Sequence, residues 1–213
     1  MRSAPWSKRP SSAEGEDADL SAQQTTPLRK AAFLDRDGTV TKSVAYYLTK
    51  PSQVELEEGA AEAIHLLRRN GYLIVLITNQ AGIARGLLTE EDLAAVNDEM
   101  LKQLAAQSVP VDGMYYCPHH PEGFIDRYAI ECECRKPKPG LLLRAARDLG
   151  IDLKSSVMIG DAERDVLAGM AAGCTTFLVN SGYLLQPTVA DHCVESLLEA
   201  ARRVCGEQAP PDK

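Results

Sequence analysis

Short apolar runs alternate along the chain with segments whose hydrophobic residues recur at helical spacing, and this alternation constrains the fold more than any other feature. Most of the short runs are apolar throughout, which is typical of parallel strands covered by helices on both faces. We expect strands at 31–34, 73–78, 113–117, 157–160 and 175–179, and a weaker one near 193–194. We expect helices at 60–70, 90–107, 139–149, 162–172 and 196–204. The pattern predicts an α/β fold, a Rossmann-like, mostly parallel sheet with helices on both faces.

Composition predicts one domain and excludes some classes of partner. With 213 residues, 45 % of them hydrophobic, the chain can build one sizeable core, which we place at residues 28–205. Residues 1–27 are expected to form a disordered tail and 206–213 a loose end. The 23 basic against 30 acidic side chains give a net charge of −7, which argues against a nucleic-acid partner. The apolar runs are far shorter than the roughly 20 residues of a membrane span, so no membrane partner is expected.

The six cysteines bear on the cellular compartment. A chain with a core of this size does not need disulfides, and the first residues lack the apolar segment of a signal peptide. We therefore expect a protein of the reducing cytoplasm.

The segment Asp35-Arg36-Asp37-Gly38-Thr39 follows the first expected strand. In an open parallel sheet the reactive crevice lies beyond the carboxyl ends of the strands, so both carboxylates are candidates for metal binding or nucleophilic attack. Taken alone, the segment could equally be a turn or a calcium loop, because Asp and Gly favour turns.

Three later features strengthen the reactive interpretation. Thr78-Asn79-Gln80 ends the second strand with groups that can donate hydrogen bonds to phosphate oxygens. Two cations, Arg135-Lys136, precede a helix start, where anions are favoured. Gly160-Asp161 ends the fourth strand, and Asp165 lies four residues further on. The ordered set predicts phosphate chemistry at one edge of the sheet.

These four motifs, in this order, resemble the phosphatases of the haloacid dehalogenase-like superfamily. The resemblance implies that Asp35 is a nucleophile that forms an aspartyl-phosphate, and that Asp37 protonates the leaving oxygen and then takes a proton from water. It implies a catalytic Mg²⁺ bound by Asp35, Asp161 and the backbone carbonyl of Asp37. Thr78 and Lys136 would hold the remaining phosphate oxygens, and Asp165 would orient Lys136 or a metal-bound water.

A second group of residues lies in the long segment 117–134, which shows neither strand nor helix periodicity. Thiolate and imidazole ligands from Cys117, His119, Cys132 and Cys134 would make a closed tetrahedral site for a structural Zn²⁺. Disulfides or free thiols are the alternative, and His120 is a second candidate for the nitrogen ligand. We prefer zinc because a loop of this length inside a domain needs a source of order.

With this loop the resemblance narrows to the heptose-bisphosphate and histidinol-phosphate phosphatase branch, in which a zinc loop stands where other members insert a cap domain. No cap domain is therefore expected. The implied reaction is hydrolysis of the 7-phosphate of D-glycero-D-manno-heptose 1,7-bisphosphate, with histidinol phosphate or another small sugar phosphate as the alternative substrate. The implied substrate contacts are Asp35, Arg36, Asp37, Ser43, Tyr46, Thr78, Asn79, Gln80, Arg135 and Lys136.

The chain departs from that branch at two places. The loop expected to contact the sugar reads Val40-Thr41-Lys42-Ser43-Val44-Ala45-Tyr46-Tyr47 rather than containing a Gly-Tyr pair, and Ala162 stands where a lysine is frequent. Both differences bear on the substrate rather than on the chemistry. Two other functions stay open, phosphoryl transfer to a sugar and a zinc-containing binding module on an inactive scaffold. We expect a monomer whose partner is a small phosphorylated sugar.

Overall fold

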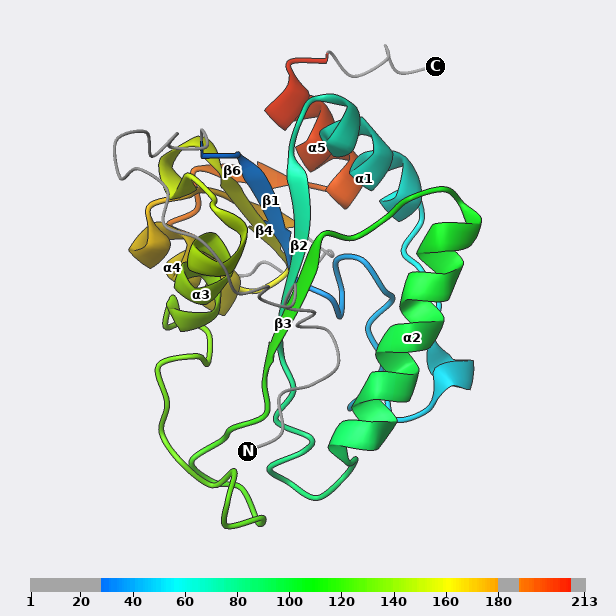
Figure 1. The fold of residues 1–213 in the computed structure, drawn as a ribbon, viewed down its shortest axis with the longest axis vertical. Helices are drawn as coiled ribbons and strands as arrows, with labels where there is room; N and C mark the ends of the chain where they lie inside the picture. Colours follow the sequence, from blue (N-terminus) through cyan, green and yellow to red (C-terminus); the bar gives the residue numbers. More distant parts are fainter. Residues whose placement is uncertain (1–27, 180–187, 208–213) are drawn as a thin grey trace, which may run out of the picture.

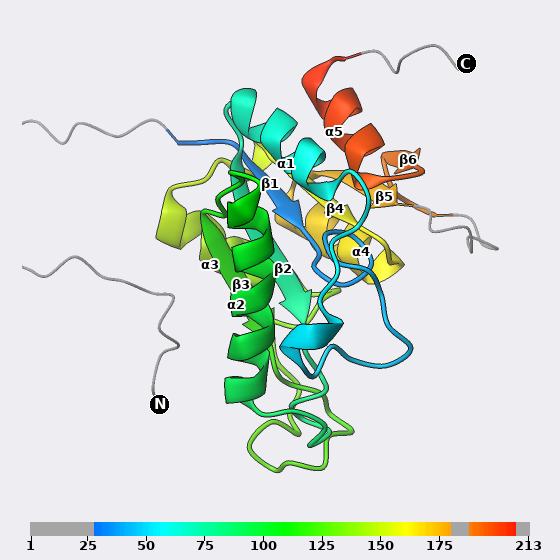
Figure 2. The same cartoon turned by 90° about the vertical axis from the view of Figure 1, so that its right-hand side faces the viewer.

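The computed structural model describes residues 28–179 and 188–207. One six-stranded sheet lies between two layers of helices (Figures 1 and 2), so the predicted α/β class is confirmed. The tail predicted at 1–27 lies outside the described residues, as does most of the predicted C-terminal end, 208–213.

All strand pairs are parallel, in the order β3-β2-β1-β4-β5-β6. The strands are β1 (Ala31–Leu34), β2 (Leu73–Asn79), β3 (Gly113–Cys117), β4 (Val157–Gly160), β5 (Thr175–Val179) and β6 (His192–Val194). The chain adds strands on one side of β1 and then on the other, which makes β1 and β4 a switch point. Sheets of this order form a crevice beyond the carboxyl ends of the strands at that point.

The helices are α1 (Ala60–Arg69), α2 (Glu90–Ala106), α3 (Gly140–Leu149), α4 (Glu163–Ala172) and α5 (Leu197–Cys205). Each end lies within one residue of the sequence-based expectation because local signals define it. The Thr89 hydroxyl accepts a hydrogen bond from the backbone N–H of Asp92 at the start of α2. Gly150 and Gly173, both in the left-handed conformation, end α3 and α4.

The sheet has a hydrophobic core on each face. Helices α1, α2 and α5 cover one face and α3 and α4 the other (Figure 1). Successive residues of β1 point alternately to the two cores, so Phe33 and Leu34 are both fully buried on opposite faces. Burial of each such side chain contributes roughly 1.5–3 kcal/mol, which explains why the strands are apolar throughout.

Two long connections leave the carboxyl edge of the sheet, residues 35–59 after β1 and 118–139 after β3. The first contains a short 3₁₀ turn at Pro51–Gln53, and the second contains neither helix nor strand. A second such turn, Leu153–Ser155, precedes β4. Within the described ranges these connections do not form a separate cap domain. No helix of the described residues is both long and apolar enough to cross a membrane.

Candidate active site

Three carboxylates meet at the switch point. Asp35 follows β1 and Asp161 follows β4, so the pairing of these strands brings the two residues together. Asp165, from the first turn of α4, completes the group, in which one ligand oxygen of each residue lies within 4.8 Å of the others. The absence of a side chain at Gly38 leaves space for the Asp161 carboxylate, because a Cβ on residue 38 would lie 2.3 Å from Asp161 Oδ2.

Lys136 places its ammonium group inside this cluster. Its Nζ lies 2.8 Å from Asp35 Oδ1 and 2.6 Å from Asp165 Oδ1, and it donates to the Ile77 carbonyl at 2.7 Å. The side chain of Asn79 binds the backbone of Lys136 on both sides: Nδ2 donates to the carbonyl at 3.0 Å and Oδ1 accepts from the amide at 3.1 Å. The end of β2 therefore holds the backbone position from which Lys136 reaches the cluster.

The electrostatics of the cluster favour a bound cation. Burial, followed by the charge of Asp165, raises the pKa of Asp35 to about 7, although Lys136 opposes the shift. Burial and Asp165 also raise the pKa of Asp161. Burial opposes the charge of Lys136, but Asp165 and Asp35 outweigh it and raise the lysine pKa. One ammonium group thus leaves the three carboxylates under-compensated.

The donor set fits a hard divalent cation such as Mg²⁺, which prefers carboxylate oxygens. Asp161 Oδ1 is buried and has no hydrogen-bond partner among the described residues, so a ligand atom is left over for a cation. Of the predicted Mg²⁺ ligands, Asp35 and Asp161 lie in the cluster. Asp37, predicted to contribute its backbone carbonyl, turns its carboxylate away toward Arg36.

Four donors hold the Asp37 carboxylate. Arg36 binds both oxygens, with Nε 3.0 Å from Oδ1 and Nη2 2.8 Å from Oδ2. Gln80 Nε2 donates to Oδ2 at 2.9 Å and to Thr78 Oγ1 at 2.8 Å, and the Thr41 hydroxyl lies 3.4 Å from Oδ1. The Asp37 side chain remains 33 % exposed, so one side of a rigidly held carboxylate faces the crevice.

Three thiols and one imidazole meet in the loop after β3. The Sγ atoms of Cys117, Cys132 and Cys134 lie 3.2–3.5 Å apart, and His119 Nδ1 lies 3.4 Å from Cys134 Sγ. A tetrahedral zinc site with bonds of about 2.0–2.3 Å has ligand atoms roughly 3.3–3.8 Å apart. The thiols lie a few tenths of an ångström closer in places, and the set of three thiols and one imidazole around one point is that of a zinc site. Hydrogen bonds, first from Cys117, lower the pKa of Cys134, which favours the thiolate that a metal needs.

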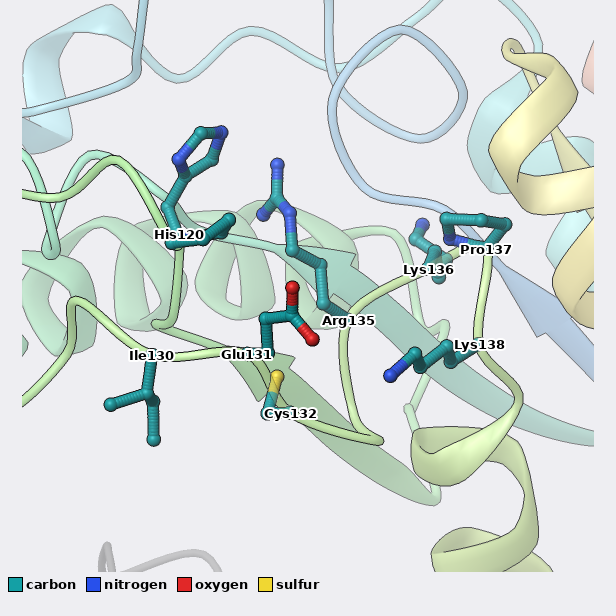
Figure 3. Close-up of a pocket in the computed structure, with 9 residues that line it drawn as sticks. His120, Ile130, Glu131, Cys132, Arg135, Lys136, Pro137 and Lys138 are labelled. Carbon is teal, nitrogen blue, oxygen red and sulfur yellow. The ribbon is translucent and has the colours of Figure 1, made fainter.

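A pocket of about 300 Å³ lies between this loop and Lys136. Arg135, Lys136, Lys138 and His120 line it against a single acid, Glu131, and Figure 3 shows the His120 ring and the Arg135 guanidinium reaching the same side. Lys136 and Lys138 are each paired with acids, whereas Arg135 forms no ion pair among the described residues, so its guanidinium is the cation of the lining that can meet an anion.

His120, which lines the pocket, lies against Arg85 of the turn after β2. The backbone N–H of Glu122 donates to His120 Nδ1 at 3.1 Å, which leaves the proton of a neutral ring on Nε2. That nitrogen lies 3.4 Å from Arg85 Nη2. Burial, Arg135 and Arg85 lower the pKa of His120, which keeps the ring neutral. Two facing donors without an acceptor suit an anion.

Known proteins share this architecture and much of the sequence. A family model described as HAD-hydrolase-like matches residues 133–200. The D-glycero-beta-D-manno-heptose-1,7-bisphosphate 7-phosphatase of Pasteurella multocida (strain Pm70) is 41 % identical over 84 % of this chain and 98 % of its own length. The chain belongs to the haloacid dehalogenase-like phosphatases. It is thus a hydrolase of phosphoric monoesters, and members of this family typically use Mg²⁺.

Two further relatives of this haloacid dehalogenase-like phosphatase carry similar names. The Escherichia coli (strain K12) protein named D-glycero-beta-D-manno-heptose-1,7-bisphosphate 7-phosphatase is 39 % identical over 84 % of this chain and 96 % of its own. The structure of D,D-heptose 1,7-bisphosphate phosphatase from B. bronchiseptica, complexed with magnesium and phosphate, is 33 % identical with a TM-score of 0.72, covering 84 % of this chain and 99 % of that one. The resemblance seen in the sequence motifs is confirmed.

The structure brings most of the predicted site residues of this phosphatase together, but not all in the predicted manner. Arg36, a predicted substrate contact, is fully buried. Its side chain binds Asp37, its backbone N–H donates to Asp35 Oδ1, and its carbonyl accepts from the backbone N–H groups of Val40 and Thr41. Ser43 and Tyr46 are exposed, Tyr46 at 87 %, and no hydrogen bond of the described residues joins either to the cluster. The side-chain amide of Asn79 hydrogen-bonds to the Lys136 backbone.

Sequence reasoning missed three residues near the centre of the phosphatase. Arg85 lies in the turn after β2, and His120 was considered only as a zinc ligand. Asn97 of α2 is buried and accepts a hydrogen bond from Arg36. Its signal was available, because a polar residue stands on the apolar stripe that Leu93, Val96 and Met100 form on this helix.

Proposed function

We propose that this phosphatase hydrolyses the 7-phosphate of a bisphosphorylated heptose, D-glycero-β-D-manno-heptose 1,7-bisphosphate. The observation that carries the proposal is the second group of cationic and donor side chains, Arg85, His120 and Arg135, beside the carboxylate cluster. A bisphosphate needs two anion sites, and a guanidinium suits the second because it can bind phosphate through two hydrogen bonds. The names of the relatives support the same substrate.

Asp35 attacks the phosphorus of the 7-phosphate, forming an aspartyl-phosphate as the bond to the sugar oxygen breaks. Asp37 gives its proton to that oxygen and afterwards takes one from the water that attacks the aspartyl-phosphate. Inorganic phosphate leaves and Asp35 is regenerated. Thr78, whose hydroxyl points to Gln80, and Lys136, already beside Asp35, hold phosphate oxygens during both steps.

Two metals complete the proposal. Asp35, Asp161 and the Asp37 carbonyl would hold Mg²⁺, which would supply positive charge against the phosphate and favour the ionised form of Asp35. Cys117, His119, Cys132 and Cys134 would hold Zn²⁺, and because the protein would supply all four ligands, its role would be structural. The zinc loop orders the pocket wall that carries Arg135.

Two observations favour the alternative substrates, histidinol phosphate or another small sugar monophosphate. Ala162 lacks the cation that many bisphosphate-cleaving relatives are expected to place there, and the loop around Ser43 and Tyr46 is exposed. A monophosphate would need neither Arg85 nor Arg135.

A substrate panel tests the proposal. Phosphate release with Mg²⁺ is measured for both anomers of heptose 1,7-bisphosphate, for histidinol phosphate and for several sugar monophosphates. We expect the β-bisphosphate to lead by about a hundredfold in kcat/KM, which is about 2.7 kcal/mol of transition-state discrimination. If a monophosphate leads, the proposed substrate is wrong although the phosphatase assignment stands.

We further propose that residues 28–205 act as a single-domain monomer in the cytoplasm. The six cysteines support a reducing compartment, because all are unpaired and three of them meet at the zinc site. Sedimentation equilibrium of the full chain tests the monomer, with a mass of 23.1 kDa expected.

A further inference from the structure

The Arg36 guanidinium is fully buried and joins the active site to α2. Two of its nitrogens bind Asp37, and the third, Nη1, donates to Asn97 Oδ1 at 2.7 Å. Because a guanidinium is planar and rigid, its orientation is fixed once partners hold both of its ends. The Asn97 carbonyl therefore helps to set the plane in which Arg36 meets the Asp37 carboxylate.

Asn97 is an unusual residue for its place. It lies in the middle of α2 with 2 % of its surface exposed, among apolar side chains that pack on the sheet. A buried amide is costly unless it is hydrogen-bonded, and Arg36 is the only side-chain partner found for it among the described residues. A leucine would fill similar space with apolar packing, so the amide oxygen has a use that packing does not explain.

The contacts lead from Asn97 to the reacting group without a gap. Asn97 holds Arg36, Arg36 holds both oxygens of Asp37, and Gln80 connects Asp37 to Thr78. Arg36, Asn97, Gln80 and Thr78 are all buried, so solvent does not loosen the arrangement. A displacement of about 1 Å in a proton-transferring group is enough to slow an enzyme strongly.

We propose that Asn97 is a positioning residue, which acts through Arg36 to hold the Asp37 carboxylate where it exchanges protons with the leaving sugar oxygen and with water. This inference rests on the proposed role of Asp37. In the first step the proton of Asp37 moves to the sugar oxygen as the P–O bond breaks and the Asp35–phosphorus bond forms. In the second step Asp37 takes a proton from water as the new P–O bond forms and Asp35 leaves.

The test compares Asn97→Leu, which removes the acceptor oxygen, with Asn97→Asp, which keeps it in nearly the same volume. Two phosphate esters separate the role in proton transfer from a general loss of structure. The nitrophenolate of 4-nitrophenyl phosphate leaves without a proton, whereas a sugar alkoxide needs one. The first step is followed by single-turnover nitrophenolate release with excess enzyme, and the sugar reaction by kcat and KM for heptose 1,7-bisphosphate.

We expect Asn97→Leu to lower kcat for the sugar phosphate about tenfold or more, with KM and single-turnover nitrophenolate release within about threefold of wild type. Asn97→Asp should restore kcat to within about threefold of wild type. The proposal is overturned if Asn97→Leu leaves kcat unchanged, or if it slows both reactions equally while Asn97→Asp fails to restore either.

Two further measurements keep the test decisive. If Asn97→Leu melts below the assay temperature, Arg36→Lys, which cannot bind Asp37 and Asn97 together, must show the same difference between the two esters. An unchanged ratio of sugar to aryl rates in Arg36→Lys rejects the proposal. If wild type does not turn over the heptose bisphosphate, the substrate proposal has failed, and the fastest alkyl phosphate of the panel replaces it here.

Discussion

The ammonium group of Lys136 lies 2.8 Å from the carboxylate of Asp35, and both side chains are buried. Without Mg²⁺, Lys136→Met leaves Asp35 and Asp165 buried without a cation. We expect it to lower the free energy of unfolding at pH 8 by about 3–5 kcal/mol, measured by urea denaturation in EDTA. Lys138→Met, which breaks an exposed ion pair with Glu133, is the control and should change stability by less than about 1 kcal/mol. Equal effects would contradict the buried-pair interpretation.

The stability of the metal-free protein should fall with rising pH because of Asp35. Its pKa of about 7 in the folded state lies above that of an unfolded aspartate, about 3.9. The folded protein therefore keeps a proton that the unfolded chain loses. The stabilising contribution of protonated Asp35 is complete below pH 4 and disappears as pH rises through 7.

Urea denaturation in EDTA measures this effect as the difference in stability between wild type and Asp35→Asn. We expect the free energy of unfolding of wild type to fall progressively, relative to that of Asp35→Asn, from pH 4.5 to 7.5. Excess Mg²⁺ should oppose the change, because it binds the ionised carboxylate. A difference that is independent of pH would show that Asp35 titrates normally.

Asp35→Asn should abolish turnover while the fold is retained. An amide fills the same space but cannot attack phosphorus, so activity should fall below about 1 % of wild type. Phosphate release and a thermal melt measure the two properties. Asp98→Asn, an exposed change on α2, controls for the loss of one charge and should keep full activity.

Removal of zinc should affect substrate binding more than chemistry. Cys132→Ser deletes one thiol ligand, whereas Lys136 keeps its backbone bonds to Asn79. We expect the variant to lose zinc, measured by atomic emission, with a rise in KM of about tenfold and a change in kcat below about threefold. Cys193→Ser, an exposed thiol outside the cluster, is the control. An equal loss in kcat would indicate that the loop also takes part in the reaction.

Arg85→Met should distinguish bisphosphate from monophosphate substrates. Loss of one guanidinium from the proposed second anion site should raise KM for the heptose bisphosphate about tenfold, which is about 1.4 kcal/mol. KM for a sugar monophosphate should stay within about twofold of wild type. Arg69→Met, an exposed arginine on α1, matches the change in charge. If KM rises equally for both substrates, Arg85 stabilises the pocket as a whole and does not bind the second phosphate.

The sequence predicted the order and ends of the elements because local signals define them, as at Thr89 and Gly150. It also predicted the meeting of Asp35 with Asp161, since parallel strand pairing implies it. The sequence did not predict the orientation of side chains in the long connections between elements. Arg36 was expected at the substrate and instead points inward to Asn97, a contact across 61 residues that no local pattern encodes.

The pair of hydrogen bonds between the Asn79 side chain and the Lys136 backbone resembles the pairing of two strands, with an amide side chain in place of a peptide group. The lysine thereby depends on the scaffold for its position, while its neighbour Arg135 depends on the loop. With the roles proposed for Lys136 and Arg135, insertions, deletions or exchanges within residues 118–134 should alter which molecules bind while Lys136 keeps its position. In that proposal, the peptide bond between Arg135 and Lys136 is the boundary between the variable part of the site and its fixed part.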